Sequence, residues 1–253
     1  MILSARHLCY ALPQRTLLQD ICFDLHAGEC VALLGANGAG KSTLLRLLLR
    51  LISPQSGAVL LDGQPLAGMK RRDIARRIAW VPQQHQPHFP FTAWQVVMQG
   101  RLPATGLGRG PSAQDEQRVA QAFADGGIAH LAARNYTRLS GGERQQVLIT
   151  RALVQDTPLI LLDEPVNGLD YGHQLQLLAQ LKTLAAGGRT LLTITHQPEH
   201  ALIAASRVLV LHEGRLIADG APHDVVNSAL ISRIYQAQVR QVDLNGGHRF
   251  FIP

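Results

Sequence analysis

The chain has 253 residues, of which 46% are hydrophobic and 17% charged, and it carries a formal net charge of +6. This composition is typical of a soluble globular protein and excludes a disordered or fibrous chain. A membrane span of about 18 apolar residues is not expected, because the best candidate, residues 44–52, is interrupted by Arg46 and Arg50. The N-terminus lacks the pattern of a secretory signal, so we expect the chain to stay in the cytoplasm.

The charge and the cysteines narrow the class of partner without fixing it. A positive net charge suits nucleic acid, an anionic membrane surface or a nucleotide substrate. Cys9, Cys22 and Cys30 form no Cys-x-x-Cys pair and lie in apolar, strand-like surroundings. We therefore expect reduced, buried thiols, with a metal site as the weaker alternative.

The first part of the chain predicts short strands around one buried strand. Apolar residues alternate at Ile21, Phe23 and Leu25, which indicates a small antiparallel layer. Residues 30–34 are continuously apolar and suit a strand that is buried on both faces. Residues 41–51 then follow helical periodicity, so the predicted order is strand, loop, helix.

The rest of the chain alternates between strands and helices. Residues 57–63 and 78–83 predict two further strands, whereas helical patterns dominate residues 91–155, which we interpret as a helical insertion. Apolar strands at 159–165 and 190–196 flank an amphipathic helix, and a hairpin, helices and a strand-like tail follow. Such alternation of strands and helices indicates a parallel sheet and an α/β fold.

Residues 35–43, GANGAGKST, match the phosphate-loop pattern G-x-x-x-x-G-K-[ST], in its expected place between a strand and a helix. The glycines let backbone N–H groups curl around phosphate oxygens, and the helix N-terminus adds a favourable partial charge. We expect Lys41 to reach the β- and γ-phosphates of ATP, Ser42 to bind Mg²⁺ and Thr43 to contact the α-phosphate. The ATP-binding candidates in this loop are Asn37, Gly38, Ala39, Gly40, Lys41, Ser42 and Thr43.

Four polar residues that follow predicted strands are candidates for the chemistry of hydrolysis. Asp163 is placed to hold Mg²⁺, and Glu164 to polarise the attacking water. Gln83 carries an amide that can bind Mg²⁺ or water and report the γ-phosphate to the helical segment. His196 is placed to contact the γ-phosphate; alone it would be a buried structural histidine, and the other motifs favour the catalytic interpretation.

The adenine ring of a nucleotide needs a platform, and few aromatic residues lie in the first half of the chain. Tyr10 precedes the phosphate loop and is a candidate for stacking on the ring, with core packing as the alternative interpretation. Arg15, in the same predicted loop, is expected to assist.

A second glycine pair lies in LSGGERQ, residues 139–145. A serine and two glycines run into a predicted helix, which indicates a second anion-binding helix start. One nucleotide needs only one phosphate loop, so we expect this second start to bind the nucleotide held by a partner copy. Asp170 lies in a later turn where that copy can approach. The candidates for the contact in trans are Ser140, Gly141, Gly142 and Glu143.

Taken in order, the phosphate loop, Gln83, LSGGERQ, LILLDEP, Asp170 and His196 resemble the nucleotide-binding subunit of ABC transporters. The resemblance implies an α/β fold with a RecA-like P-loop NTPase core, an antiparallel β-subdomain and an inserted α-helical subdomain. It also implies a head-to-tail homodimer that sandwiches two ATP molecules, with Glu164 as catalytic carboxylate and His196 as switch histidine. The implied division is 1–88 with 156–220 for the core and β-layer, 89–155 for the helical subdomain and 221–253 for a C-terminal extension.

Residues 89–103 and 169–178 are similar, more closely, to ATPases of bacterial importers for iron-siderophores, haem or cobalamin. This resemblance implies a cytoplasmic position beneath a dimeric membrane permease, fed by a periplasmic substrate-binding protein. A permease helix is expected near Phe91, Trp94 and Arg101.

Other ATPases remain alternatives: a molybdate-type importer, or an exporter or lipoprotein-release system. A nucleic-acid ATPase is disfavoured, because the chain has neither a long coiled-coil insertion nor a second cassette. The transported molecule stays open, since its contacts would lie on other chains.

Overall fold

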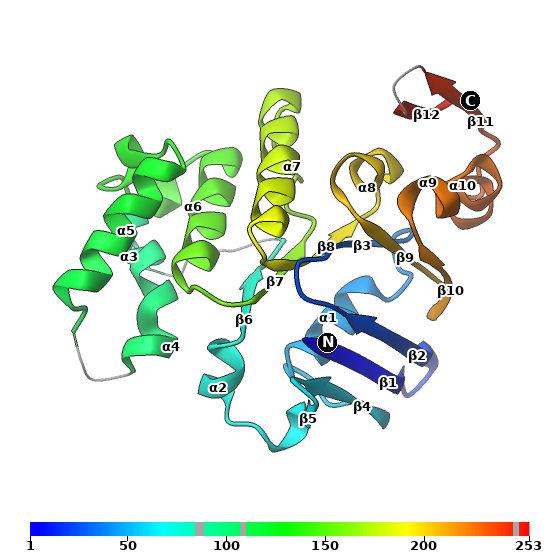
Figure 1. Ribbon diagram of the computed structural model, residues 1–253, viewed down its shortest axis with the longest axis horizontal. Helices are drawn as coiled ribbons and strands as arrows, with labels where there is room; N and C mark the ends of the chain where they lie inside the picture. Colours follow the sequence, from blue (N-terminus) through cyan, green and yellow to red (C-terminus); the bar gives the residue numbers. More distant parts are fainter. Residues whose placement is uncertain (84–88, 107–109, 245–247, 253) are drawn as a thin grey trace. The chain divides into compact units, whose positions relative to one another are not determined.

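The structure, a computed structural model, describes residues 1–83, 89–106, 110–244 and 248–252 (Figure 1). Two compact units divide the chain: Met1–Met69 with Leu178–Pro253 form the first, and Lys70–Leu177 the second. One junction between the units falls inside helix α7, Tyr171–Ala186. The subdomain limits drawn from the sequence stay a prediction.

The first unit contains an antiparallel sheet in the order β2-β1-β4-β5. In β2, the buried residues Ile21, Phe23 and Leu25 alternate with exposed or half-buried ones. Because successive side chains of a strand point to opposite faces, this pattern gives the sheet one buried face. The predicted antiparallel layer is therefore confirmed. Its strands are β1 Leu3–Leu12, β2 Arg15–Leu25, β4 Ser56–Leu61 and β5 Gln64–Pro65.

The same unit contains strands in the order β10-β9-β3-β8, of which β9, β3 and β8 run parallel. Strand β3 pairs in parallel with both neighbours, so Leu33 lies opposite Ile194 and Leu209. All of β3 is buried, as its unbroken apolar sequence predicts. The antiparallel pair β9–β10 turns at Glu213 and Gly214, which both have positive φ, as in a type I′ hairpin. The strands are β3 Cys30–Leu34, β8 Thr190–Thr195, β9 Arg207–His212 and β10 Arg215–Gly220.

Helix α1, Lys41–Leu48, follows β3 and ends earlier than its apolar periodicity predicts. The cause is Arg50, whose φ of 54° is left-handed. The Leu51 N–H then donates to the Arg46 carbonyl at 2.8 Å and closes the helix end. The leucine pattern continues past this point, so periodicity alone overestimates the helix.

Short helices and a hairpin complete the first unit. Ala201 of α8 and Ile231 and Ile234 of α10 pack on buried Val208 and Val210 of β9. The helical stretch and the strand-like tail predicted for this region are confirmed. The elements are η1 Leu66–Gly68, α8 Pro198–Ala204, α9 Pro222–Val225, α10 Ser228–Tyr235, β11 Arg240–Leu244 and β12 His248–Ile252.

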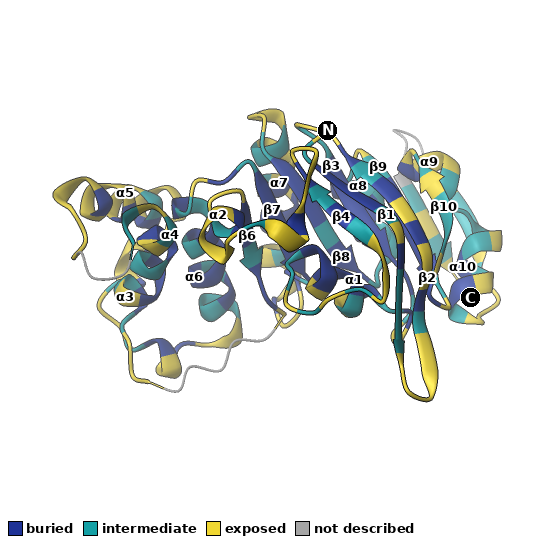
Figure 2. Cartoon of the chain, turned by 90° about the horizontal axis from the view of Figure 1, so that it is seen from below, coloured by how far each residue is buried: buried dark blue, intermediate teal, exposed yellow. Residues whose placement is uncertain are grey.

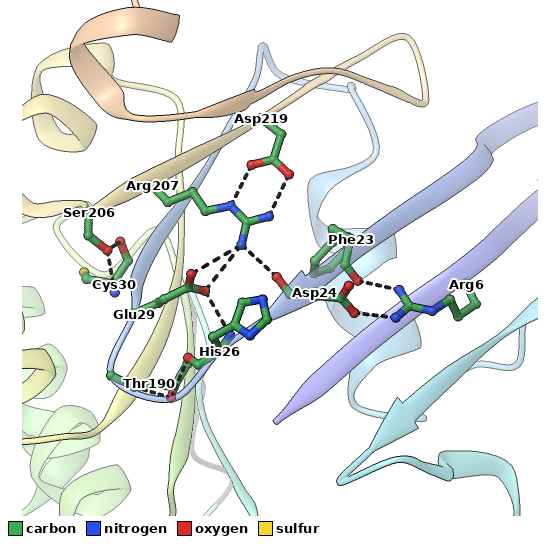
Figure 3. Close-up of polar contacts among 11 residues, drawn as sticks. Arg6, Phe23, Asp24, His26, Glu29, Cys30, Thr190, Ser206, Arg207 and Asp219 are labelled. Atoms are coloured by element: carbon green, nitrogen blue, oxygen red, sulfur yellow. Dashed lines mark hydrogen bonds and ion pairs between the residues drawn. The ribbon is translucent and has the colours of Figure 1, made fainter. Parts of the chain in front are cut away.

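One guanidinium joins the antiparallel layer to the parallel strands within the first unit (Figure 3). Arg207, at the start of β9, makes a two-pronged ion pair with Asp219 of β10, at 2.6 and 2.7 Å. Its remaining nitrogen donates to the Asp24 carbonyl of β2 at 3.0 Å and to the Glu29 carboxylate at 3.4 Å. The hydrogen bond with Asp219 is the main reason why the Arg207 pKa is raised. A planar guanidinium with this many partners fixes the relative position of the three segments.

In the second unit, two strands pair in parallel. Strand β6, Ile78–Val81, lies beside β7, Leu159–Asp163, which is buried along its whole length. The Gln155 amide donates to the carbonyls of Ala75 and Ile78, at 2.6 and 3.0 Å, and so fastens the start of β6.

Helices form the rest of the second unit (Figure 1). Gly100, just after α3, approaches α6 so closely that an added Cβ would stand 2.3 Å from the Arg151 carbonyl oxygen. The Trp94 ring of α3 stacks on Phe123 of α5, with centroids 5.8 Å apart. The predicted helical character of this region is confirmed. The elements are α2 Arg71–Ala75, α3 Ala93–Met98, η2 Gln99–Arg101, α4 Leu102–Thr105, α5 Ala113–Asp125, η3 Ala129–Leu131, η4 Tyr136–Arg138 and α6 Gly141–Val154.

Three of these helices begin with the same device, a capping box. Before α3, α5 and α6, the side chain of a serine or threonine accepts a hydrogen bond from the third helical N–H. The side chain at that third position returns a bond to the capping residue's N–H, so two backbone donors are satisfied at each start. The capping pairs are Thr92 with Gln95, Ser112 with Asp115 and Ser140 with Glu143.

Arg101 departs from its predicted role as a permease contact, because its side chain lies inside the second unit. Its Nε donates to Asp115 at 2.8 Å, and the two side chains are 10% and 6% exposed. A further nitrogen donates to the Val154 carbonyl at 2.7 Å. The hydrogen bond from Arg101 lowers the Asp115 pKa to about 2. The guanidinium is thus committed to the fold and is not presented to a partner.

The expectation of three buried thiols is also wrong in part. Cys30, in β3, is buried, and burial raises its pKa to about 11. Cys9 is half-buried and Cys22 exposed. Cys22 stands between Ile21 and Phe23, which face the core, so the period of the strand turns its thiol outward.

Candidate functional site

A glycine-rich loop connects β3 to α1 in the first unit. Gly35 leaves β3 so close to β9 that an added Cβ would stand 2.3 Å from the Leu211 carbonyl oxygen. Gly38 and Gly40 have φ of 81° and 108°, a region that residues with a side chain rarely adopt. The first turn of α1 contains no acidic residue. Its N-terminal N–H groups are therefore suited to an anion.

Lys41 places a positive charge within this loop. The residue is 6% exposed, and its Nζ donates to the carbonyls of Gly35 and Ala36, at 2.6 and 2.9 Å. On the same helical turn, Ser42 is exposed and Thr43 half-buried. This arrangement can neutralise phosphate charge and offer a hydroxyl beside it. The other predicted ATP-binding residues are Asn37 and Gly38, which are exposed, Gly40, which is half-buried, and Ala39, which is buried.

The structure brings His196 to the same edge of the sheet as the phosphate loop. Thr195 at the end of β8 lies opposite Leu34 at the end of β3, so both chain segments leave neighbouring parallel strands together. His196 is half-buried, and the Tyr235 hydroxyl donates to its carbonyl oxygen at 2.6 Å. His200, on α8, is buried, and its pKa is lowered mainly by burial and further by the charge of His196.

Tyr10 and Arg15 lie near the tip of the β1–β2 hairpin, whose turn is exposed (Figure 2). Tyr10 is half-buried and pairs with Leu18, while Arg15 is exposed and pairs with Leu12. Both residues belong to the unit that carries the phosphate loop. Their contact with an adenine ring stays a prediction.

The second unit brings Gln83 and Glu164 together. The Gln83 amide donates to one carboxylate oxygen of Glu164 at 2.8 Å, and the Asn167 amide donates to the same oxygen at 2.8 Å. The parallel pairing explains this meeting, since Val81 lies opposite Leu162 and both chains continue for two residues beyond that pair. The carboxylate of Glu164 is thus oriented by two amides.

The two acidic residues at the end of β7 differ in their surroundings. Asp163 is the last strand residue and is buried, whereas Glu164 is half-buried. Glu164 has a φ of 47°, which is uncommon for a residue with a side chain. Backbone conformations of this kind are concentrated at functional sites.

The predicted second helix start is built on Ser140. Its hydroxyl accepts from the Glu143 N–H at 3.3 Å, and Glu143 accepts from the Ser140 N–H at 2.7 Å. Arg134 adds an ion pair to Glu143 at 2.6 Å. The bonds from Ser140 are the main reason why the Glu143 pKa is lowered. Ser140 and Gly141 themselves are exposed.

This helix start lies beside the turn that leads into α7. A Cβ on Gly142 would stand 3.3 Å from the Leu169 side chain, and one on Gly141 would stand 3.9 Å from the Gly168 carbonyl oxygen. Asp170, next in the chain, is exposed and accepts from the His173 N–H at 3.0 Å. That backbone bond is the main reason why the Asp170 pKa is lowered. The start of α6 and the turn that holds Asp170 thus lie close together in the second unit.

The segment after Gln83 carries an exposed pair of aromatic rings. Phe89 and Phe91 are 64% and 38% exposed, with ring centroids 5.9 Å apart. Trp94 is half-buried because of its stacking. Within the described ranges, the chain has no helix with both the length and the apolar composition of a membrane span.

Sequence reasoning missed Asn167, Phe89 and Arg134. Asn167 follows Glu164 by three residues in a tight turn, and an amide at that spacing could have been predicted to donate to the carboxylate. Phe89 and Phe91 stand on either side of a proline, and this pattern could have predicted that both rings are exposed. The contact of Arg134 with Glu143 depends on how the chain folds between η3 and η4, and no local sequence pattern predicts it.

Comparisons with known proteins agree with these motifs. Residues 18–167 match the family model described as ABC transporter. The chain is 44% identical over 232 residues to the hemin import ATP-binding protein HmuV of Nocardia farcinica, which covers 91% of this chain and 80% of that protein. It is 36% identical over 242 residues to the ferric enterobactin transport ATP-binding protein FepC of Escherichia coli, covering 95% and 89% of the two chains.

A solved structure of a metal-chelate type ABC transporter in an inward-facing conformation is similar with a TM-score of 0.86. The identity is 31%, and the match covers 100% of this chain and 96% of that one. The predicted α/β fold and the predicted family are thereby confirmed. The chain belongs to the ABC transporter family, as one of the ATP-binding subunits that hydrolyse ATP to power transport.

Proposed function

We propose that this chain powers the import of a metal chelate, such as an iron-siderophore, haem or cobalamin, through a partner permease. The observation that carries the proposal is the pair of relatives named for hemin import and ferric enterobactin transport, at 44% and 36% identity. The similar solved structure of metal-chelate type points in the same direction. These similarities favour a metal chelate over molybdate and import over export.

For the nucleotide, we propose the following roles in binding and cleaving ATP. Lys41 and the glycine loop hold the phosphates, His196 contacts the γ-phosphate, and Glu164 is the base for the attacking water. The orientation of the Glu164 carboxylate by two amides, each at 2.8 Å, supports its role as base. Tyr10 and Arg15 hold the adenine.

Mg²⁺ is proposed to be held by Ser42, Gln83 and Asp163. These side chains supply hydroxyl, amide and carboxylate oxygens, which are the ligands that Mg²⁺ prefers. Gln83 uses its Nε2 in the bond to Glu164, so its Oε1 is the atom that suits a cation. Bound Mg²⁺ would neutralise phosphate charge during cleavage.

We also propose that two copies act as a head-to-tail homodimer. Ser140, Gly141 and Gly142 then offer the exposed start of α6 to the ATP of the other copy, and Asp170 contacts that copy. The exposure of Ser140, Gly141 and Asp170 supports this assignment. Glu143 takes part indirectly, because Ser140 and Arg134 already occupy its carboxylate.

The membrane partner is proposed to dock on the aromatic pair Phe89 and Phe91, with Trp94 behind it. Phe89 follows Gln83 by six residues in the sequence, so contact there would link the permease to the segment that follows Gln83. The chain would act at the cytoplasmic face of the plasma membrane, and a periplasmic binding protein would deliver the substrate to the permease.

The test is reconstitution with a permease that copurifies with this chain. Proteoliposomes with ATP inside or outside would be assayed for uptake of labelled haemin, ferric siderophore, cyanocobalamin and molybdate, with the Glu164→Gln chain as the inactive control. We expect ATP-dependent accumulation of one metal chelate, and none with the variant. Uptake of molybdate alone, or movement of substrate only outward, would contradict the proposal.

A further inference from the structure

Two consecutive bulges distort the pairing of β1 with β2. First, β1 places two residues, including His7, opposite Cys22 alone; then β2 places two residues, including Asp20, opposite Cys9 alone. His7 and Asp20 both adopt left-handed conformations, with φ of 48° and 53°. Bulges re-aim side chains. Here they turn the His7 imidazole of β1 and the Asp20 carboxylate of β2 toward the exposed Cys22 thiol of β2.

The ligand atoms of His7, Asp20 and Cys22 converge. His7 Nδ1 lies 2.7 Å from Asp20 Oδ1 and 3.5 Å from Cys22 Sγ, and that sulfur lies 3.9 Å from Asp20 Oδ1. All three atoms lie within 4.8 Å of one another. The His7 and Asp20 side chains are 76% and 60% exposed, so an ion can reach them from solvent.

We propose that His7, Asp20 and Cys22 form a surface site for a divalent transition-metal ion of the zinc class. Tetrahedral zinc geometry puts nitrogen and sulfur ligands, or oxygen and sulfur ligands, about 3.6 Å apart, and nitrogen and oxygen ligands about 3.4 Å apart. The two distances to sulfur, 3.5 and 3.9 Å, already fit this geometry. Only the His7–Asp20 contact must lengthen from its hydrogen-bonded 2.7 Å.

The donor set selects the metal. Thiolate and imidazole are soft or borderline ligands that favour Zn²⁺, Co²⁺ or Ni²⁺ over Mg²⁺ and Ca²⁺. With three protein ligands, water would take the fourth position, as in open zinc sites. The site is therefore chemically distinct from the oxygen ligands proposed for Mg²⁺.

The surrounding backbone supports a metal-bound thiolate. The His7 N–H donates to Cys22 Sγ at 3.1 Å, and a donor to sulfur favours its anionic form. Gly57 of β4 holds the bulge from the other side, since an added Cβ there would stand 2.2 Å from the His7 carbonyl oxygen. The hydrogen bond that the metal must replace joins two exposed side chains, and such surface pairs contribute little to stability.

The experiment uses the tag-free full chain, stripped with chelator and free of nucleotide, and titrates it with Co²⁺. We expect one equivalent of Co²⁺ to produce a thiolate-to-cobalt absorption band, and Zn²⁺ to abolish it by displacement. Cys22→Ser should remove the band. His7→Ala and Asp20→Asn should weaken Zn²⁺ binding in a competition with a chromophoric chelator by at least about 100-fold, because losing even a supporting partner of a ligand costs about 10–100-fold.

The matched control is His26→Ala, which removes an exposed imidazole from the same strand region and should leave binding unchanged. A second measurement is thermal unfolding, in which Zn²⁺ should raise the midpoint of the wild-type chain and of His26→Ala but not of Cys22→Ser. Absence of the cobalt band in the wild-type chain, or its survival in Cys22→Ser, would overturn the proposal. Neither outcome depends on ATP hydrolysis or on a permease.

Discussion

The side-chain amide of Gln83 donates a 2.8 Å hydrogen bond to the carboxylate of Glu164, across the parallel pair β6 and β7. The bond connects the segment that leads to the exposed aromatic rings with the acid that follows β7. A change in the position of either residue is therefore felt by the other. This contact gives the proposed coupling between hydrolysis and membrane partner a physical starting point.

Replacing Glu164 by glutamine should abolish turnover while keeping ATP binding. The amide preserves the shape and can still accept from Gln83 and Asn167, but it cannot take a proton from water. Loss of a positioned general base lowers the rate by roughly 10²–10⁴-fold. Phosphate release and equilibrium binding of ATP would be measured side by side. The matched control is Glu116→Gln, on the exposed face of α5, and a normal rate in Glu164→Gln would remove this residue from the role of base.

Alanine substitutions at Ser140 and Ser112 can distinguish a loss of helix stability from a loss of contact with the partner's nucleotide. Ser140 and Ser112 each begin a helix with a capping box, so alanine at either position should cost about 1 kcal/mol of stability. Only Ser140→Ala should also weaken ATP-dependent dimerisation, measured by light scattering in the Glu164→Gln background. Equal dimerisation by the two variants would argue against a contact between Ser140 and the partner's ATP.

An aspartate at Phe91 should prevent assembly with the permease and leave the ATP site intact. The ring is 38% exposed, so the substitution places a charge in the proposed interface without opening the core. Copurification with the permease would be measured. Phe250→Asp is the control, because Phe250 is also an exposed phenylalanine, at 46%, and lies on β12. Unchanged assembly of Phe91→Asp would move the docking surface elsewhere.

Asp115→Asn should destabilise the second unit by leaving the Arg101 guanidinium buried without its counter-charge. Removing one partner of a buried pair costs about 3–5 kcal/mol. Urea unfolding at neutral pH would measure the change, with Asp73→Asn, on the exposed surface of α2, as the control.

The same pair predicts a pH dependence. Hydrogen bonding to Arg101 lowers the Asp115 pKa from 3.8 to about 2. A lowered folded-state pKa means that the stabilisation is present above the unfolded value and is lost as pH falls through the folded one. The difference in unfolding free energy between wild type and Asp115→Asn should therefore be constant above about pH 5, where Asp115 is ionised in both the folded and the unfolded state. It should shrink as the pH falls from 3.8 to 2. A difference that persists at pH 2 would contradict the assignment.

Sequence alone was sufficient where chemistry is local. The phosphate loop, the strands that end at Asp163 and Thr195, and the helix that starts at Ser140 are each encoded within a few consecutive residues. Glycine spacing, apolar runs and capping residues carry that information directly. The fold class followed from the order of these local signals.

Sequence was insufficient where a residue's environment is set by distant segments. Arg101 is buried because the fold brings Asp115 of α5 and the Val154 carbonyl of α6 against it. The exposure of Cys22 is explained by the alternation of side chains along β2. The positions of the His7 and Asp20 side chains beside it depend on two bulges, which composition does not predict. Long-range packing and irregular pairing thus account for both corrections.

Neighbouring strands approach the phosphate loop of the first unit closely at two of its glycines. The β9 carbonyl faces Gly35, and a Cβ on Gly40 would stand 2.9 Å from the Leu17 carbonyl oxygen of β2. Residues with a side chain therefore cannot replace Gly35 or Gly40 without displacing a neighbouring strand. The hairpin tip near Arg15, which is proposed to hold the adenine, is exposed. The proposed nucleotide site would thus combine a triphosphate grip fixed by close packing with a base contact on an exposed hairpin.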